Sequence, residues 1–147
     1  MTARLYSTFI PMEPKGKQRP KIVRRANSPF PVAITPDQTV MAENRVQGHV
    51  AGEWQRPPYE GPLQVQIVVR LQKPASKPKK RPCWPTGKPD SDNYAKLLLD
   101  ALNGVVWRDD SQVCRLFVEK VYCDLAHPAQ GFGLVVHAMD MELEVAP

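Results

Sequence analysis

The stretch Leu63-Gln-Val-Gln-Ile-Val-Val-Arg-Leu71 decides the fold class, because apolar and polar residues alternate along it. An alternation with period two places one set of side chains on one face of a β-strand. The stretch therefore predicts a strand with one buried face. Its apolar set is Leu63, Val65, Ile67, Val69 and Leu71.

A helical pattern follows this strand after a proline-rich segment. Apolar residues recur at i, i+3, i+4, i+7 and i+8, the spacing of one face of an amphipathic helix. They are Tyr94, Leu97, Leu98, Ala101 and Leu102. Gly104 stands where a left-handed residue would close the helix.

Weaker patterns predict the other elements. Residues 5–12 and 112–122 alternate as strands, and a last strand over about 132–144 is expected to pair with strand 112–122. Thr35 as a hydroxyl cap and Pro36 at the first helical position predict a helix over about 36–54, in which the apolar residues Val46, Val50 and Trp54 recur at four-residue steps. The order is β-α-β-α-β-β, which predicts an α+β fold: a mixed β-sheet with two main helices packed on one face.

Length and composition indicate one globular domain over residues 1–147. The three cysteines show no C-x-x-C spacing, so neither a disulfide framework nor a zinc site is expected. His49 has no second His or Cys at ligand spacing and is interpreted as a surface residue. Without a signal segment or a long apolar run, the protein is expected to be soluble and cytoplasmic, with no membrane partner.

The net charge of +5 comes from basic residues that gather in two loops, at about 13–30 and 72–89. Such loops can neutralise DNA phosphates, although they can also be solvated loops without a ligand. Trp84 could stack on an unpaired base or anchor its loop. The candidate DNA-binding residues are Lys15, Lys17, Arg19, Lys21, Lys77, Lys79, Lys80, Arg81 and Lys88.

Acidic residues beside these loops form a candidate metal site. Asp90 and Asp92 stand at the predicted helix start, and Asp110 precedes the next strand. Carboxylates are typical ligands of Mg²⁺, with Mn²⁺ as an alternative, and Lys96 would lie within reach of the same phosphate. The other interpretation is that Asp90, Ser91 or Asp92 caps a helix and that Asp109-Asp110 forms a turn.

Several motifs together resemble those of RusA-type Holliday junction resolvases. The densest is Lys88-Pro-Asp-Ser-Asp-Asn-Tyr-Ala-Lys96, and the basic run Pro14-Lys-Gly-Lys-Gln-Arg-Pro-Lys21 resembles the early motif of that family. The order continues with Leu99-Asp-Ala-Leu-Asn-Gly104, Trp107, Asp109-Asp-Ser-Gln-Val113 and Glu119-Lys120.

The resemblance implies a homodimeric, Mg²⁺-dependent endonuclease that makes paired nicks in four-way DNA junctions during recombination and repair, often encoded by prophages. It implies a catalytic set of Asp90, Asp92, Lys96 and Asp110, with the three acids as metal ligands. Asn93 and Gln112 would support this set. Whether Asp109 binds the metal or only shapes its turn stays open.

Two other functions share these features. A non-catalytic, structure-selective DNA-binding protein would also carry basic loops, but it would need no metal. A nuclease for flaps or single strands would use the same acids, and an exposed Trp84 would suit its substrate.

Overall fold

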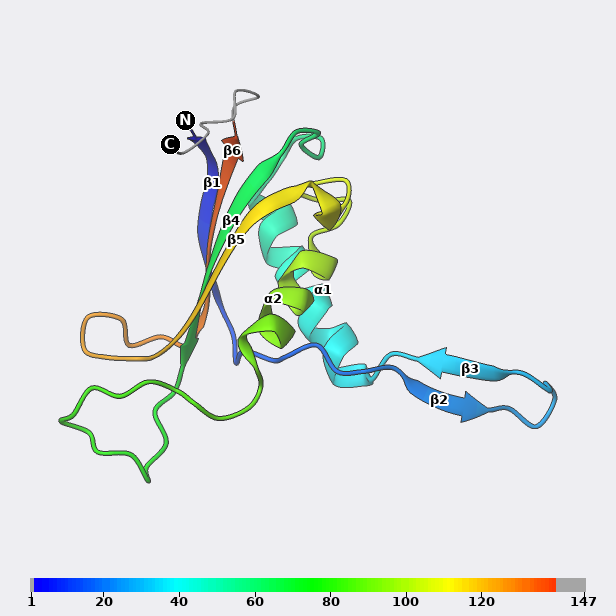
Figure 1. Cartoon of the computed structure of the whole chain (residues 1–147), viewed down its shortest axis with the longest axis horizontal. Coiled ribbons are helices and arrows are strands. Elements are labelled where there is room, and N and C mark those ends of the chain that lie inside the picture. Colours follow the sequence, from blue (N-terminus) through cyan, green and yellow to red (C-terminus); the bar gives the residue numbers. More distant parts are fainter. Residues whose placement is uncertain (1, 140–147) are drawn as a thin grey trace, which may run out of the picture.

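A four-stranded sheet forms the centre of the computed structural model, which describes residues 2–139 (Figure 1). Its strand order is β1 (Thr2–Pro11), β6 (Gly131–Met139), β4 (Leu63–Leu71) and β5 (Val113–Tyr122). β4 and β5 are parallel, whereas β6 is antiparallel to both β1 and β4. The predicted mixed sheet and the predicted bounds of β4 are confirmed.

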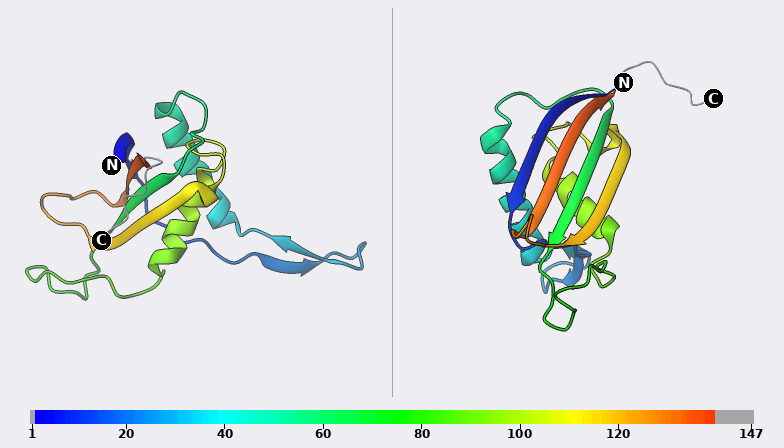
Figure 2. Two further views of the ribbon diagram at one scale, coloured as in Figure 1. Left: turned by 45° about the horizontal axis from the view of Figure 1, so that its top comes forward. Right: turned by 90° about the vertical axis from the view of Figure 1, so that its left-hand side faces the viewer.

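Two helices, α1 (Asp37–Glu53) and α2 (Ser91–Ala101), cover one face of the sheet. The right-hand view of Figure 2 looks onto the other face, with both helices behind the strands. The chain therefore has the predicted α+β architecture with its helices on one side.

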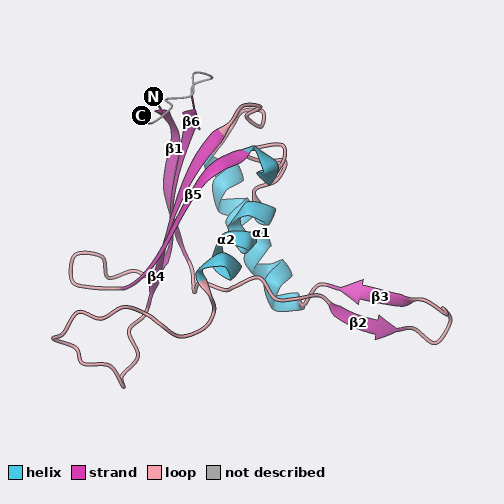
Figure 3. Ribbon diagram, in the orientation of Figure 1, coloured by secondary structure: helices cyan, strands magenta, loops and turns pink. Residues whose placement is uncertain are grey.

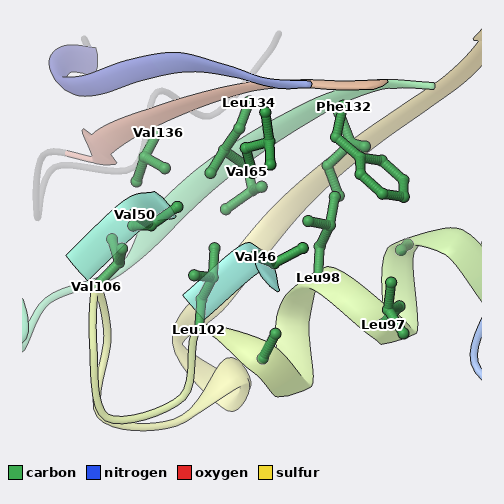
Figure 4. Close-up of a cluster of buried hydrophobic side chains, with 14 of the residues drawn as sticks. Val46, Val50, Val65, Leu97, Leu98, Leu102, Val106, Phe132, Leu134 and Val136 are labelled. Atoms are coloured by element: carbon green, nitrogen blue, oxygen red, sulfur yellow. The ribbon is translucent and has the colours of Figure 1, made fainter. Parts of the chain in front are cut away.

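The core lies between the helices and the sheet (Figure 4). Val46 and Val50 of α1 and Leu98 of α2 are fully buried, as the four-residue and three-residue spacings predicted. The strands contribute alternate residues, because successive side chains point to opposite faces. These buried strand residues are Val65, Ile67, Val69, Phe132, Leu134 and Val136.

The predicted pairing of the last two strands is wrong. β6 lies between β1 and β4, and β4 separates it from β5. Burial explains the order: β5 is an edge strand that leaves Leu116 and Phe117 42% and 55% exposed, whereas Phe132 and Leu134 of β6 are fully buried. Neighbours in sequence usually pair, but the more apolar strand occupies the centre of the sheet. Residues 140–144 of the predicted strand lie outside the described residues.

The first basic loop contains a hairpin that the sequence did not predict. β2 (Lys21–Arg24) and β3 (Pro31–Ile34) pair antiparallel as a separate two-stranded sheet. Figure 3 shows this hairpin projecting from the domain beyond one end of α1. Its strands have four residues each, only β2 carries basic residues, and neither strand alternates between apolar and polar residues, so the periodicity that reveals a half-buried strand is missing.

The helix ends differ in how well they were predicted. α1 begins at Asp37 with Pro36 as its N-cap and no side-chain cap, so the predicted Thr35 cap is wrong. The Thr39 hydroxyl, in the first turn of α1, does not cap the helix either: it accepts a hydrogen bond from the Gln18 amide at 3.2 Å. Gly104 has a φ of 80°, which confirms the left-handed residue after α2. No helix within residues 2–139 combines the length and apolar character needed to cross a membrane.

Candidate active site

The predicted catalytic residues gather around α2 and the turn before β5. Asp90 is the N-cap of α2, Asp92 lies in its first turn, and both are exposed. Asp110 begins a short 3₁₀ helix, Asp110–Gln112, that leads into β5. Lys96 Nζ lies 3.9 Å from Asp110 Oδ2. The fold therefore brings Lys96 and Asp110 together, although fourteen positions separate them in the sequence.

Two of the acids have different roles at their helix ends. Asp90 makes no side-chain cap bond to α2, so its carboxylate stays available for another partner. Asp109 accepts a hydrogen bond from the Ser111 amide at 3.2 Å and forms a capping box with Gln112. That hydrogen bond also lowers the pKa of Asp109. The interpretation of Asp109 as a residue that shapes its turn is thus supported, whereas Asp90 holds the N-cap position of α2 without a side-chain cap bond.

Metal binding by Asp90, Asp92 and Asp110 stays a prediction. Among residues 2–139, no three side chains of His, Cys, Asp or Glu come together as a group that could hold a metal ion. The chemistry of the predicted set still fits a divalent cation, because hard carboxylate oxygens suit Mg²⁺ and the Asp90 carboxylate is not used as a cap.

Asp100 is the site residue that the sequence reasoning missed. Its Oδ1 lies 3.1 Å from Lys96 Nζ, and its Oδ2 lies 3.2 Å from Lys17 Nζ. Lys17 also pairs with Glu43 of α1. The four-residue step from Lys96 to Asp100 was the available signal, since such residues are neighbours on a helix. Asp92 stands four positions before Lys96, but within the described residues the two form no ion pair.

These ion pairs keep both lysines protonated. The hydrogen bond with Asp100 is the main cause of the raised pKa of Lys96. Burial alone would lower the pKa of Lys17, but hydrogen bonds to Glu43 and Asp100 outweigh it, and the pKa is raised. The Lys96 side chain is 57% exposed. It therefore offers a fixed positive charge to a ligand, while the charge of Lys17 is shared between two carboxylates.

The segment before Asp90 is held from the sheet side by Lys120 of β5. Lys120 Nζ donates to the carbonyl oxygens of Gly87 at 2.9 Å and Pro89 at 3.1 Å. A charged donor to two backbone carbonyls fixes the path of the chain into α2. The sequence reasoning quoted Lys120 in the family signature but gave it no role.

The early basic motif holds the same segment from the other side. The Lys17 amide donates to the Asn93 carbonyl at 2.9 Å. Gly16 allows this approach, because a Cβ added there would stand 2.8 Å from Pro89 Cβ and 3.3 Å from Asn93 Cβ. Two stretches far apart in the sequence thus meet at the start of α2.

Gln112 fixes the turn that carries Asp110. Its Oε1 accepts from the Arg108 amide at 2.9 Å and the Asp109 amide at 3.1 Å. Its Nε2 donates to the carbonyls of Tyr59 at 2.8 Å and Gly61 at 3.0 Å. Two of these four hydrogen bonds hold the turn itself, and the other two tie it to the segment before β4, consistent with the expected supporting role.

A cleft of about 920 Å³ lies where the early basic motif meets the start of α2, and its lining stops short of the candidate acids, since none of Asp90, Asp92 and Asp110 lines it. Lys15, Lys17 and Lys88 line it together with Asn93 and other residues of both basic segments. Its volume suits a group of nucleotide size. The remaining basic candidates are exposed: Arg19 and Lys21 near or on the hairpin, and Lys77, Lys79, Lys80 and Arg81 on the loop before α2.

Trp84 and His49, which the sequence brought into consideration as possible functional residues, both lie outside the group formed by Lys96 and the candidate acids. Trp84 is exposed on the loop before α2, so it does not anchor that loop in the core. His49 Nε2 lies 2.7 Å from Glu53 Oε1 and 2.9 Å from the Thr8 hydroxyl. This agrees with its interpretation as a surface residue rather than a metal ligand.

Comparisons with known proteins give one family model and one curated relative whose name states no function. The family model described as Endodeoxyribonuclease RusA matches residues 11–127, which include every residue of the cluster. A curated relative, "Uncharacterized protein YqaN" of Bacillus subtilis (strain 168), is 40% identical over 73 residues, 44% of this chain and 51% of the relative. The chain thus spans about half the length of that relative.

Proposed function

This chain belongs to the family of RusA endodeoxyribonucleases, and from that premise we propose that it resolves four-way DNA junctions by metal-dependent, paired symmetric nicks. The observation that carries the proposal is the arrangement of Lys96. Asp100 holds this lysine against Asp110, at the exposed side of a helix that begins with Asp90 and Asp92.

The chemistry requires that a water lose a proton near neutral pH and that charge on the phosphate be offset. Asp90, Asp92 and Asp110 would hold Mg²⁺, or alternatively Mn²⁺, which supplies an activated water and a Lewis acid for the phosphate. Lys96 is protonated at neutral pH and would contribute a positive charge to the same phosphate, held in place by the hydrogen bond with Asp100 that also raises its pKa.

Binding of the substrate would rest on the basic cleft and loops. Lys15 and Lys88 line the cleft and can meet phosphates next to the cut, while Lys79 and Lys80 extend from the loop before α2. A four-way junction is two-fold symmetric, so a C₂ homodimer with one site in each protomer matches two opposed incisions.

Cleavage of a labelled four-way junction by the wild type and by Asp90→Asn, each with Mg²⁺ and with EDTA, tests the proposal. We expect paired symmetric nicks from the wild type with Mg²⁺ only, and a loss of at least about a thousandfold for Asp90→Asn. Tight binding without cleavage in any divalent metal would contradict the enzyme and leave a DNA-binding protein.

Asp109→Asn is the matched control. It also removes a carboxylate at a helix end, but Asp109 serves its own turn by accepting from Ser111. We expect cleavage to persist and stability to stay close to that of the wild type, because Asn caps a helix about as well as Asp.

Flap or single-strand cleavage is the second candidate, and the exposed side chain of Trp84 favours it. Four-way, flap and linear substrates of equal length separate the two. If the protein is a junction resolvase, it should cut the four-way junction fastest. Faster cleavage of the flap would assign it to the flap and single-strand nucleases.

A further inference from the structure

The hairpin of β2 and β3 stands apart from the core, and of its residues only Arg19 and Lys21 are among the candidates for contact with phosphates. We name residues 19–35 the arm. Its strands pair from Lys21 with Ile34 to Arg24 with Pro31, and Figure 2 shows it extending away from the helices and the sheet. A two-stranded hairpin without a covering layer is marginally stable in water. The arm therefore gains most from a partner surface.

Apolar side chains on the arm are exposed. Ile22 is 76% exposed and Phe30 is 73% exposed, and Val23 and Ile34 are also exposed. Ile22 and Val23 are successive residues of β2, so they point to opposite faces of the ribbon. Both faces thus present apolar atoms to a partner, which suits insertion into a groove better than docking on a flat surface.

The charge of the arm indicates the chemistry of that partner. Arg19, Lys21, Arg24 and Arg25 lie on it, and no acidic residue stands between Glu13 and Asp37. A basic surface of a second copy would repel the arm, so the arm itself is a poor dimer contact even though another face of the chain can serve one. A polyanion complements the arm, and the major groove of duplex DNA is wide enough to admit a two-stranded ribbon.

The base of the arm is fixed at the candidate active site. The Gln18 amide donates to the Thr39 hydroxyl at 3.2 Å, and the Lys17 amide donates to the Asn93 carbonyl at 2.9 Å. The chain runs from Gln18 through β2 to the turn at residues 26–27. At roughly 3.3 Å per residue of extended chain, the arm therefore reaches about 30 Å. This is the length of about nine base pairs of duplex, close to one helical turn.

We propose that the arm grips a duplex segment of the substrate, laying its basic and apolar side chains along a groove beyond the cut site. This inference rests on the proposed function for the identity of the substrate. It adds Arg24, Arg25 and Phe30 to the DNA-binding surface, and it places their contacts on paired DNA rather than on the junction centre.

The test is binding to a four-way junction and to a duplex in EDTA, so that cleavage plays no part. The variants are Arg24→Ala with Arg25→Ala, and separately Phe30→Ala. Since each phosphate contact contributes about 0.9 to the salt slope, the double variant should lower the slope by about 2 and weaken binding about tenfold. Phe30→Ala should weaken binding without changing the slope.

The control removes equal charge elsewhere. Arg4 of β1 and Arg115 of β5 are exposed on the sheet, away from the arm, and their double alanine variant should bind with nearly the wild-type slope. Equal losses in the control and the arm variant would overturn the inference, because net charge alone would explain them. An arm variant that binds like the wild type would also overturn it.

Oligomeric state and cleavage distinguish the remaining outcomes. If the arm variants change the mass of the protein measured by light scattering, the arm holds a second copy and the inference fails. If the wild type cuts no junction in any metal but the arm variants still lose affinity and slope, the proposed function fails and the inference stands.

Discussion

Asp100 connects the two lysines of the candidate site. It accepts from Lys96 on its own helix and from Lys17 of the early basic motif. A carboxylate shared in this way restricts both side chains and keeps them charged. We interpret Asp100 as a positioning residue, since it holds Lys96 against Asp110 and needs no contact with DNA.

Asp100→Asn should lower the rate of junction cleavage about tenfold, with Asp100→Glu recovering part of the loss, because Lys96 would no longer be held in place. The pH profile provides the sharper readout. Asp100 raises the pKa of Lys96, so the charged lysine persists as pH rises. Without Asp100 that pKa falls, and the alkaline decline of the single-turnover rate should begin at lower pH.

An unchanged alkaline limb in Asp100→Asn, with only a uniform loss of rate, would contradict this role and indicate a purely structural carboxylate. Thermal unfolding of both variants serves as the control for folding.

Gly16→Ala should separate the early basic motif from α2. The added Cβ would stand 2.8 Å from Pro89 Cβ, closer than side-chain atoms approach, so the chain must shift. Overpacking of this kind costs about 1–3 kcal/mol. We expect lower stability in urea denaturation together with weaker cleavage.

Gly48→Ala is the matched control, because a Cβ there meets nothing within 4 Å. It lies inside α1, where alanine is favoured over glycine by about 1 kcal/mol, so this variant should be more stable than the wild type. Equal behaviour of the two variants would refute the close approach at Gly16.

At the scale of elements, a side chain of the edge strand β5 fixes the segment that leads into α2. Lys120 points to the helix side of the sheet, next to Val69 of β4, and reaches the carbonyls that precede Asp90. An edge strand thus positions the start of a helix. The sequence could not reveal this contact, because strand periodicity indicates which face a side chain takes but not what it touches.

Lys120→Met should loosen the segment 87–92 while the sheet persists, since the methylene stem is kept and only the two hydrogen bonds are lost. We expect faster amide exchange over that segment, by about five- to tenfold, and slower cleavage. Arg115→Met, on the same strand but the opposite face, should change neither. Exchange that rises across all of β5 in Lys120→Met would instead indicate loss of the strand.

At the scale of the whole molecule, the proposed junction substrate needs two cuts, whereas the described residues of each chain form one candidate site. We expect mixed dimers of wild type and Asp90→Asn, purified through two different tags, to nick one strand only. On a plasmid with an extruded cruciform they should yield nicked circles, whereas the doubly tagged wild type yields linear product. Linear product from the mixed dimers would show that one site makes both cuts.

The sequence by itself determined the α+β class, the central strand β4, the core faces of both helices and the residues of the family signature. These follow from local periodicity and motif order, which depend on neighbours in the chain. Two local features were not predicted correctly. Thr35 was expected to cap α1 but does not, and the strands of the arm alternate too little between apolar and polar residues to be recognised as a hairpin.

Only the tertiary structure decided which strands pair and which charges meet. β6 takes the central place because burying its apolar face outweighs the preference for a neighbour in sequence. Lys17, Glu43 and Asp100 come from three separate segments, and packing of α1 against α2 brings them within ion-pair distance. Distances between residues that are far apart in the sequence depend on how the core packs, and periodicity along the chain does not predict them.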